Sequence, residues 1–167
     1  MSRAFVKEDT SEPPLVVPRA PLPEGTPNYV TRRGLALLRD ERAVLEAARP
    51  DPEAPGGAAA LSAHHARLSA LEARINSAQV LDAATLPHDE VRFSALVSLR
   101  GEAGAERRYR IVGVDEADAR SGRIAFTAPL AVALAGKRVG DVVSLRQPGG
   151  EVELEIVGID YAQEPAQ

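Results

Sequence analysis

A run of prolines and a glycine pair divides the first half of the chain into two helical stretches. After a possible N-cap at Thr31, apolar residues follow the spacing of an amphipathic helix, at Leu35, Leu37, Leu38, Val44, Leu45 and Ala48. Beyond the run, apolar residues recur at the heptad spacing of a coiled-coil seam, at Leu61, Leu68 and Ile75, with Leu71 and Ala78 between them. Helix continuation is unfavourable at Pro50, Pro52, Pro55, Gly56 and Gly57. We therefore predict an antiparallel α-helical hairpin within residues 29–84, with its first helix ending near Arg49, its second starting near Ala58 and a length of about 30 Å.

The second half of the chain changes to a period of two, which is typical of half-buried strands. The first predicted strand alternates from Val91 to Leu99, and others follow at 109–114 and 124–126. Pro129 opens a short helix, and a closing hairpin turns at 147–150. The predicted fold class is α+β: the helical hairpin, then an antiparallel β domain with one short helix at residues 88–162.

Residues 1–28 contain six prolines between Pro13 and Pro27, which predicts a disordered or polyproline-like lead-in. The net charge of −4 disfavours free-standing binding to nucleic acid, so a protein partner is expected. The absence of cysteine excludes disulfides and thiolate chemistry. No apolar stretch is long enough for a membrane span. We expect a cytoplasmic monomer.

Five segments in order resemble the bacterial Gre (GreA/GreB) transcription elongation factor family. They are residues 29–35 (YVTRRGL), 76–82 (NSAQVLD), 91–95 (VRFSA), 109–116 (YRIVGVDE) and 127–141 (TAPLAVALAGKRVGD). The resemblance implies a coiled-coil finger, an FKBP-like C-terminal domain without implied isomerase activity, and docking on RNA polymerase at its secondary channel. Contact with nucleic acid would then be indirect, through the elongation complex.

In that family two acidic residues at the fingertip hold a Mg²⁺ ion that the polymerase uses to cleave backtracked RNA. Carboxylates and water are the ligands such chemistry needs. Here the tip reads RPDPEAPGG, so Asp51 and Glu53 are the candidate metal-holding acids, at a different spacing and inside a Pro/Gly loop. Each arm is also shorter than in the usual factors by roughly ten residues, or about 15 Å of reach. The chain resembles a short-coil variant of the family.

Each candidate residue also has a purely structural interpretation. Asp51 and Glu53 could be solvated loop charges, metal carriers, or contacts to a channel wall. His64 and His65 point about 100° apart on a helix, so we predict a seam residue and a solvated one rather than a metal pair. Thr127, Ala128 and Pro129 correspond to a turn that contacts the polymerase in the family, and Pro129 also simply suits a first helical turn.

Two hypotheses follow. The first is a non-enzymatic regulator that binds RNA polymerase and inserts a shortened finger into the secondary channel, with weak or absent stimulation of cleavage or an inhibitory effect. It has no catalytic residue and no cofactor of its own, and any Mg²⁺ is shared with the polymerase. The second is a protein-interaction module that binds another partner, as short-coiled relatives linked to nucleoside diphosphate kinase regulation do.

Overall fold

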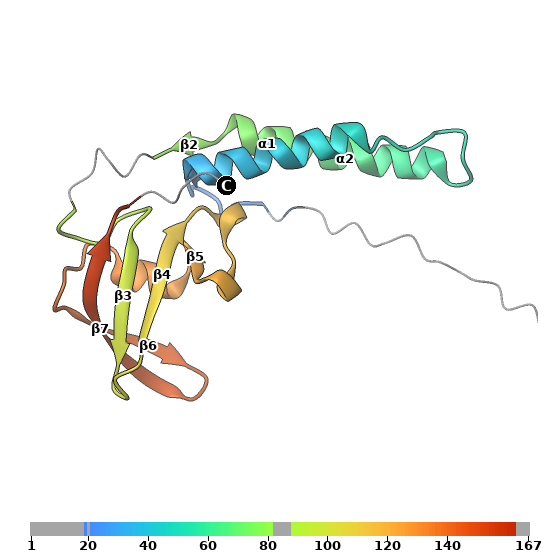
Figure 1. Cartoon of the computed structure of the whole chain (residues 1–167). Coiled ribbons are helices and arrows are strands. Elements are labelled where there is room, and N and C mark those ends of the chain that lie inside the picture. Colours follow the sequence, from blue (N-terminus) through green and yellow to red (C-terminus); the bar gives the residue numbers. More distant parts are fainter. Residues whose placement is uncertain (1–18, 20, 82–87, 163–167) are drawn as a thin grey trace, which may run out of the picture.

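The chain folds into a helical hairpin that is joined at its base to a curled β-sheet (Figure 1). This computed structural model describes residue 19 and residues 21–81 and 88–162. The predicted α+β class is confirmed, since the two long helices precede a five-stranded sheet that carries one short helix. Most of the predicted lead-in, residues 1–18 and 20, lies outside the described residues. Neither long helix of the described part is apolar enough to cross a membrane.

The hairpin consists of α1 (Arg32–Ala47) and α2 (Gly57–Asn76). Thr31 is the N-cap of α1, as predicted: its hydroxyl oxygen accepts the Gly34 N–H at 2.9 Å. This bond satisfies one of the N–H groups that the first turn leaves without a helical partner. The two helices end and begin within two residues of the positions that the Pro/Gly run predicted.

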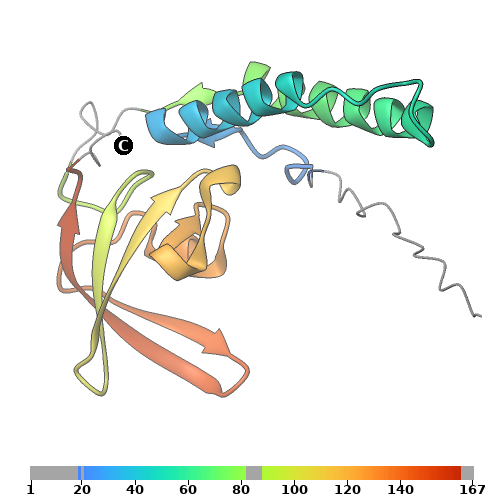
Figure 2. The same ribbon diagram turned by 45° about the vertical axis from the view of Figure 1, so that its right-hand side comes forward.

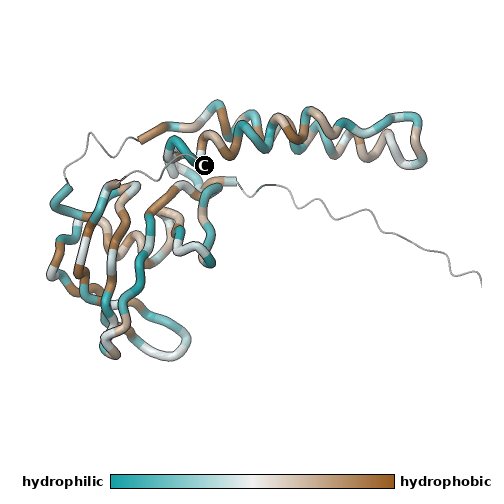
Figure 3. Tube along the Cα trace, in the orientation of Figure 1, coloured by the Kyte–Doolittle hydropathy of each residue, from teal (hydrophilic) through white to brown (hydrophobic). Residues whose placement is uncertain are grey.

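A small apolar cluster holds the two helices together. Leu38, Leu45 and Leu71 are buried in it together with Val30, and the half-buried Leu35, Leu68, Ile75 and Ala78 pack around them. Apolar and polar residues accordingly alternate along both helices (Figure 3). At the open end, β1 (Tyr29–Val30) pairs in parallel with β2 (Gln79–Val80) and closes the base.

The predicted apolar face of α1 was too wide. Leu37 and Val44 are 43% and 68% exposed. Each precedes a buried leucine, Leu38 or Leu45, by one residue, which turns it about 100° away from the seam. Leu37 and Val44, which are seven residues apart, therefore form a second apolar stripe on the outside of α1.

The β domain has the strand order β5-β4-β3-β7-β6. Its strands are β3 (Leu96–Gly101), β4 (Glu106–Val112), β5 (Arg123–Ala125), β6 (Val142–Gln147) and β7 (Gly150–Asp160). Two short 3₁₀ helices, η2 (Val114–Glu116) and η3 (Ala119–Ser121), separate β4 from β5. Helix α3 (Pro129–Leu134) lies on the inner face of the sheet (Figure 2).

Two details of the sheet differ from the sequence-based prediction. The strand predicted from Val91 begins only at Leu96, because the backbone turns at Ser94, whose φ is 71°. The sheet is not wholly antiparallel either, since β5 pairs in parallel with β4. The turns η2 and η3 carry the chain back before β5 starts, so both strands run in the same direction.

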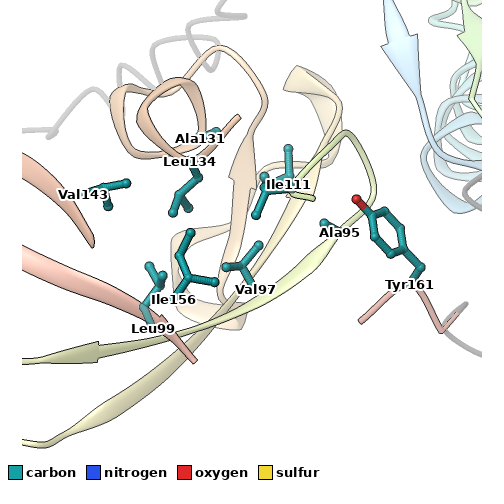
Figure 4. Packing of buried hydrophobic residues seen from close by; sticks show 10 residues of the cluster. Ala95, Val97, Leu99, Ile111, Ala131, Leu134, Val143, Ile156 and Tyr161 are labelled. Atoms are coloured by element: carbon teal, nitrogen blue, oxygen red, sulfur yellow. The ribbon is translucent and has the colours of Figure 1, made fainter. Parts of the chain in front are cut away.

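One apolar core lies between the sheet and α3 (Figure 4). Side chains from four strands meet Ala131 and Leu134 of α3 there: Val97, Leu99, Ile111, Val143 and Ile156. Tyr161 closes the edge of this core, where its hydroxyl donates to the Glu90 carbonyl and accepts the Arg92 N–H. Burial raises the pKa of this hydroxyl, so it stays protonated and keeps donating at neutral pH.

The stability of the hairpin should depend on Leu71 far more than on Leu37. Truncation of Leu71, which is 1% exposed, leaves a cavity in a small cluster, so Leu71→Ala is expected to lower the free energy of unfolding by about 2–4 kcal/mol. Leu37→Ala, the matched control on the exposed stripe, should change it by less than about 1 kcal/mol. Urea unfolding followed by circular dichroism measures both, and equal losses would contradict this packing.

Candidate functional site

The loop at the hairpin tip is held in a defined turn by its own residues. The Asp51 carboxylate accepts the Glu53 N–H at 2.9 Å, and the Asp51 carbonyl accepts the Ala54 N–H at 3.3 Å. Asp51 and Glu53 are both exposed, at the end of the hairpin farthest from the β domain (Figure 1). The tip therefore presents two carboxyl groups, one of which has an oxygen engaged in the turn.

Gly57 allows the tip to fold back on the start of α2. A Cβ atom at this position would overlap the Asp51 carbonyl oxygen and lie 2.9 Å from the Pro52 carbonyl carbon. Gly56 precedes it with φ at 75°, a conformation that favours glycine. The Pro/Gly run thus does more than end two helices, because it fixes how the acidic loop is presented.

Among the described residues, the two tip acids are not part of a larger group of possible metal ligands. No group of three or more His, Cys, Asp or Glu residues that could hold a metal ion occurs among the described residues. Mg²⁺ usually takes one or two carboxylates and completes its octahedron with water and other oxygens. Asp51 and Glu53 could supply two ligands of such an ion, and water or a partner would supply the rest.

The two adjacent histidines do not converge. His64 is half-buried beside the seam and His65 is exposed, with 6.1 Å between their ring centroids. Their separation on the helix surface agrees with a seam residue and a solvated one.

The second candidate surface lies at the start of α3. Thr127 and Pro129 are exposed, whereas Ala128 is the N-cap of α3 and packs against the core. Val132, one turn later, is 61% exposed. Of the three predicted partner-binding residues, Ala128 therefore packs on the core. Thr127 and Pro129 are exposed together with Val132.

The joint between the hairpin and the β domain contains contacts that the sequence analysis did not predict. Tyr29 of β1 contacts two aromatic rings of the β domain, with centroid distances of 6.0 Å to Phe93 and 5.5 Å to Phe126. Its carbonyl oxygen lies 2.5 Å from where a Cβ atom of Gly113 would stand. The backbone of β1 can cross the end of β4 this closely only because residue 113 is glycine.

A buried carboxylate lies at the centre of the joint. The side chain of Glu116 is 2% exposed, and it accepts a hydrogen bond from the Thr31 hydroxyl. Arg33 of α1 donates to it at 3.1 Å, and Arg123 of β5 lies 4.0 Å away. Such partners offset the desolvation that makes a lone buried carboxylate unfavourable. Glu116 thus binds the first turn of α1 to the β domain.

A second ionic group lies beside it and involves the other helix. Arg74 of α2 is 7% exposed and pairs with Asp115 at 3.3 Å. Asn28 holds the end of α2, since its side chain donates to the Arg74 carbonyl at 2.7 Å and to the Ser77 hydroxyl at 3.0 Å. The sequence offered one signal for this pair, because Arg74 stands among the apolar positions of the seam. Its acidic partner Asp115 lies 41 residues further on and could not be identified from that spacing.

Comparison with known proteins points to one family. Residues 86–161 match the family model "Transcription elongation factor, GreA/GreB, C-term". Transcription elongation factor GreA of Anaeromyxobacter sp. (strain K) is 37% identical over 154 residues, covering 81% of this chain and 93% of the relative. GreA of Methylobacterium nodulans is 46% identical over 104 residues, covering 62% of this chain and 66% of the relative. Against several such relatives the chain thus spans less than two thirds of their length.

Similar solved structures include a GreA/GreB factor from Nitrosomonas europaea and the GreA factor homolog Gfh1 from Thermus thermophilus. The first is 24% identical, with a TM-score of 0.42 over 80% of this chain and 98% of that structure. The second is 21% identical, with a TM-score of 0.38 over 81% of this chain and 99% of that structure.

The presentation of the tip should depend on Gly57. Gly57→Ala forces the loop away from α2, and we expect it to lower the free energy of unfolding by about 1–3 kcal/mol, as overpacking usually does. The matched control is Gly149→Ala in the turn between β6 and β7, where a Cβ atom meets nothing within 4 Å. Thermal unfolding measures both changes, and a Gly57→Ala protein as stable as the control would contradict the close packing of the loop.

Proposed function

The chain belongs to the GreA/GreB family of transcription elongation factors, and on this premise we propose that it binds RNA polymerase through the β domain and directs the hairpin into the secondary channel. The observation that carries the proposal is the separation of two exposed surfaces. The start of α3 and the hairpin tip lie on different parts of the molecule, and the joint around Glu116 connects them. A factor that docks at one point and acts at another needs this arrangement.

In this proposal the β domain docks through Thr127, Pro129 and the exposed Val132. An apolar side chain surrounded by a polar rim is a frequent anchor at protein interfaces. The hairpin then enters the channel with its seam closed, so that α1 and α2 move as one rod. The protein works without an active site of its own, and it reaches nucleic acid only within the elongation complex.

Stimulation of transcript cleavage is proposed to be weak or absent. The tip offers two carboxyl groups at most, one of them engaged in the loop, and the arms of the hairpin are 16 and 20 residues long. When bound, Mg²⁺ supplies Lewis-acid chemistry and an activated water. Asp51 and Glu53 could only present an ion whose remaining ligands, and the reacting RNA, belong to the polymerase.

A second candidate function is a protein-interaction module that uses the hairpin on another partner. The exposed Leu37 and Val44 favour it, because they place an apolar stripe on the outside of α1. Competition separates the two candidates. If the first candidate is right, a secondary-channel ligand should displace the protein from RNA polymerase. If the second is right, that ligand should not change the binding of the protein to its own partner.

Docking is tested by a charge placed on the proposed surface. Val132→Lys should weaken binding to RNA polymerase core by at least about tenfold, or 1.4 kcal/mol, because it buries a charge at the interface. Val142→Lys is the control: it is similarly exposed, at 54%, but alternates with the buried Val143 and so points to the opposite face of the sheet. Equal affinities for the two variants would contradict docking through α3, and no binding by the unaltered protein would overturn the proposal.

Cleavage is tested in a stalled elongation complex. We expect the unaltered protein to release little or no cleaved RNA, and Asp51→Ala with Glu53→Ala to leave that background unchanged. Strong cleavage by the unaltered protein that the double variant abolishes would instead establish a cleavage factor.

A further inference from the structure

One side chain of the lead-in reaches into the joint. The guanidinium of Arg19 pairs with Glu41 of α1 through Nη2 and with Asp115 of η2 through Nη1. These partners come from the hairpin and from the β domain, 22 and 96 residues further along the chain. A single residue that belongs to neither unit thus connects both.

The second carboxylate oxygen of Asp115 is used as well. Arg74 pairs with it at 3.3 Å, so α1 reaches Asp115 through Glu41 and Arg19, and α2 reaches it directly. Two arginines and two acids balance in charge. Removal of Arg19 leaves Asp115 with Arg74 but takes away the connection between Glu41 and the β domain.

The backbone after Arg19 is held against the hairpin. Pro21 and Leu22 line a hollow of about 310 Å³ together with Ala70, Ala73 and Ser77 of the α2 side. A turn follows, in which the Thr26 N–H donates to the Pro23 carbonyl at 3.0 Å, and the chain then enters β1. The segment runs beneath the hairpin on the side that faces the β domain (Figures 1 and 2). The prolines restrict this segment in advance, which lowers the entropy lost when Arg19 is placed.

Glu41 lies far enough along α1 for its contact with Arg19 to restrict tilting of the hairpin. The contacts of α1 with the β domain through Thr31 and Arg33 lie at the base, where the hairpin would pivot. Glu41 lies nine residues beyond Arg32, about 13 Å along the axis, whereas α1 extends about 22 Å. A brace at this distance from the pivot limits tilting more effectively than one at the base.

We propose that Arg19 is a positioning residue, which sets the angle between the hairpin and the β domain by bridging Glu41 to Asp115. It extends the proposed function, but its test needs no polymerase, because the angle belongs to the isolated protein. Failure of the angle test would leave docking through α3 untouched, and failure of docking would leave the bridge in place.

The bridge should respond to salt, because its arginine keeps its charge. Burial alone would lower the pKa of Arg19, but the hydrogen bonds and charges of Glu41 and Asp115 raise it on balance. The guanidinium therefore stays charged wherever the protein is folded. Salt screens partly exposed ion pairs, with a Debye length of about 3 Å at 1 M.

The angle is measured as a distance between two spin labels. The chain has no cysteine, so Ala54→Cys at the exposed tip and Ser144→Cys on β6 provide a unique labelled pair. Double electron–electron resonance on the unaltered background should give one narrow distance distribution. With Arg19→Ala the distribution should broaden and its mean should move by about 2–4 Å, given the length of α1 as a lever. High salt should broaden the first distribution and leave the second unchanged.

Three further variants separate positioning from general stability. Glu41→Gln removes the other end of the bridge and should broaden the distribution in the same way, with no further effect when combined with Arg19→Ala. Arg19→Lys should restore the angle only in part, because an ammonium group lacks the fork that spans two carboxylates. Arg100→Ala, which removes exposed pairs with Glu106 and Glu155 on the sheet, is the matched control and should change nothing. Folded Arg19→Ala and Glu41→Gln proteins with unchanged distributions would overturn the proposal.

Discussion

The buried carboxylate of Glu116 is the interaction on which the arrangement of the two units depends. A helical hairpin with so small an apolar seam needs something at its base to hold it, because helical stability in proteins comes mainly from tertiary packing. Glu116 provides this support through the Thr31 hydroxyl and Arg33, at the first turn of α1. Gly34 allows the approach, since a Cβ atom there would lie 2.7 Å from the carboxylate. The residue that caps the helix is therefore also the residue that attaches it.

The joint brings together two segments that are distant in the sequence. Residues 29–35 and 109–116 are separated by the rest of the hairpin and by β3, yet they meet: Tyr29 crosses Gly113, and Thr31 reaches Glu116. The close crossing requires glycine at position 113, and the buried carboxylate of Glu116 requires hydrogen-bond donors from the start of α1. The two segments therefore form one interface.

The elements could be predicted from the sequence where a local rule determines them. The Pro/Gly run, the Thr31 cap and Pro129 at the start of α3 act within a few residues, and the structure has all three. The exposed stripe, the parallel β5 and the joint could not be predicted in the same way. Whether Leu37 or Leu38 faces the seam depends on the partner helix, and the partners of Arg74, Glu116 and Arg19 across the joint lie 22 to 96 residues away. Ion pairs at such separations leave no periodic pattern in the sequence, whereas apolar seams do.

The ion pairs of the joint fix the direction of the hairpin in a way that apolar packing alone would not. Apolar packing tolerates sliding, because its energy depends on area rather than direction. Carboxylates paired with arginine forks fix direction as well, since their hydrogen bonds weaken steeply when misaligned. In the proposed function the tip carries only two carboxyl groups, so what it can do depends on where it is placed relative to the docking surface. In that proposal the ion pairs of Glu116 and Asp115, which add direction to the aromatic packing of Tyr29 in the joint, would set the placement of the tip.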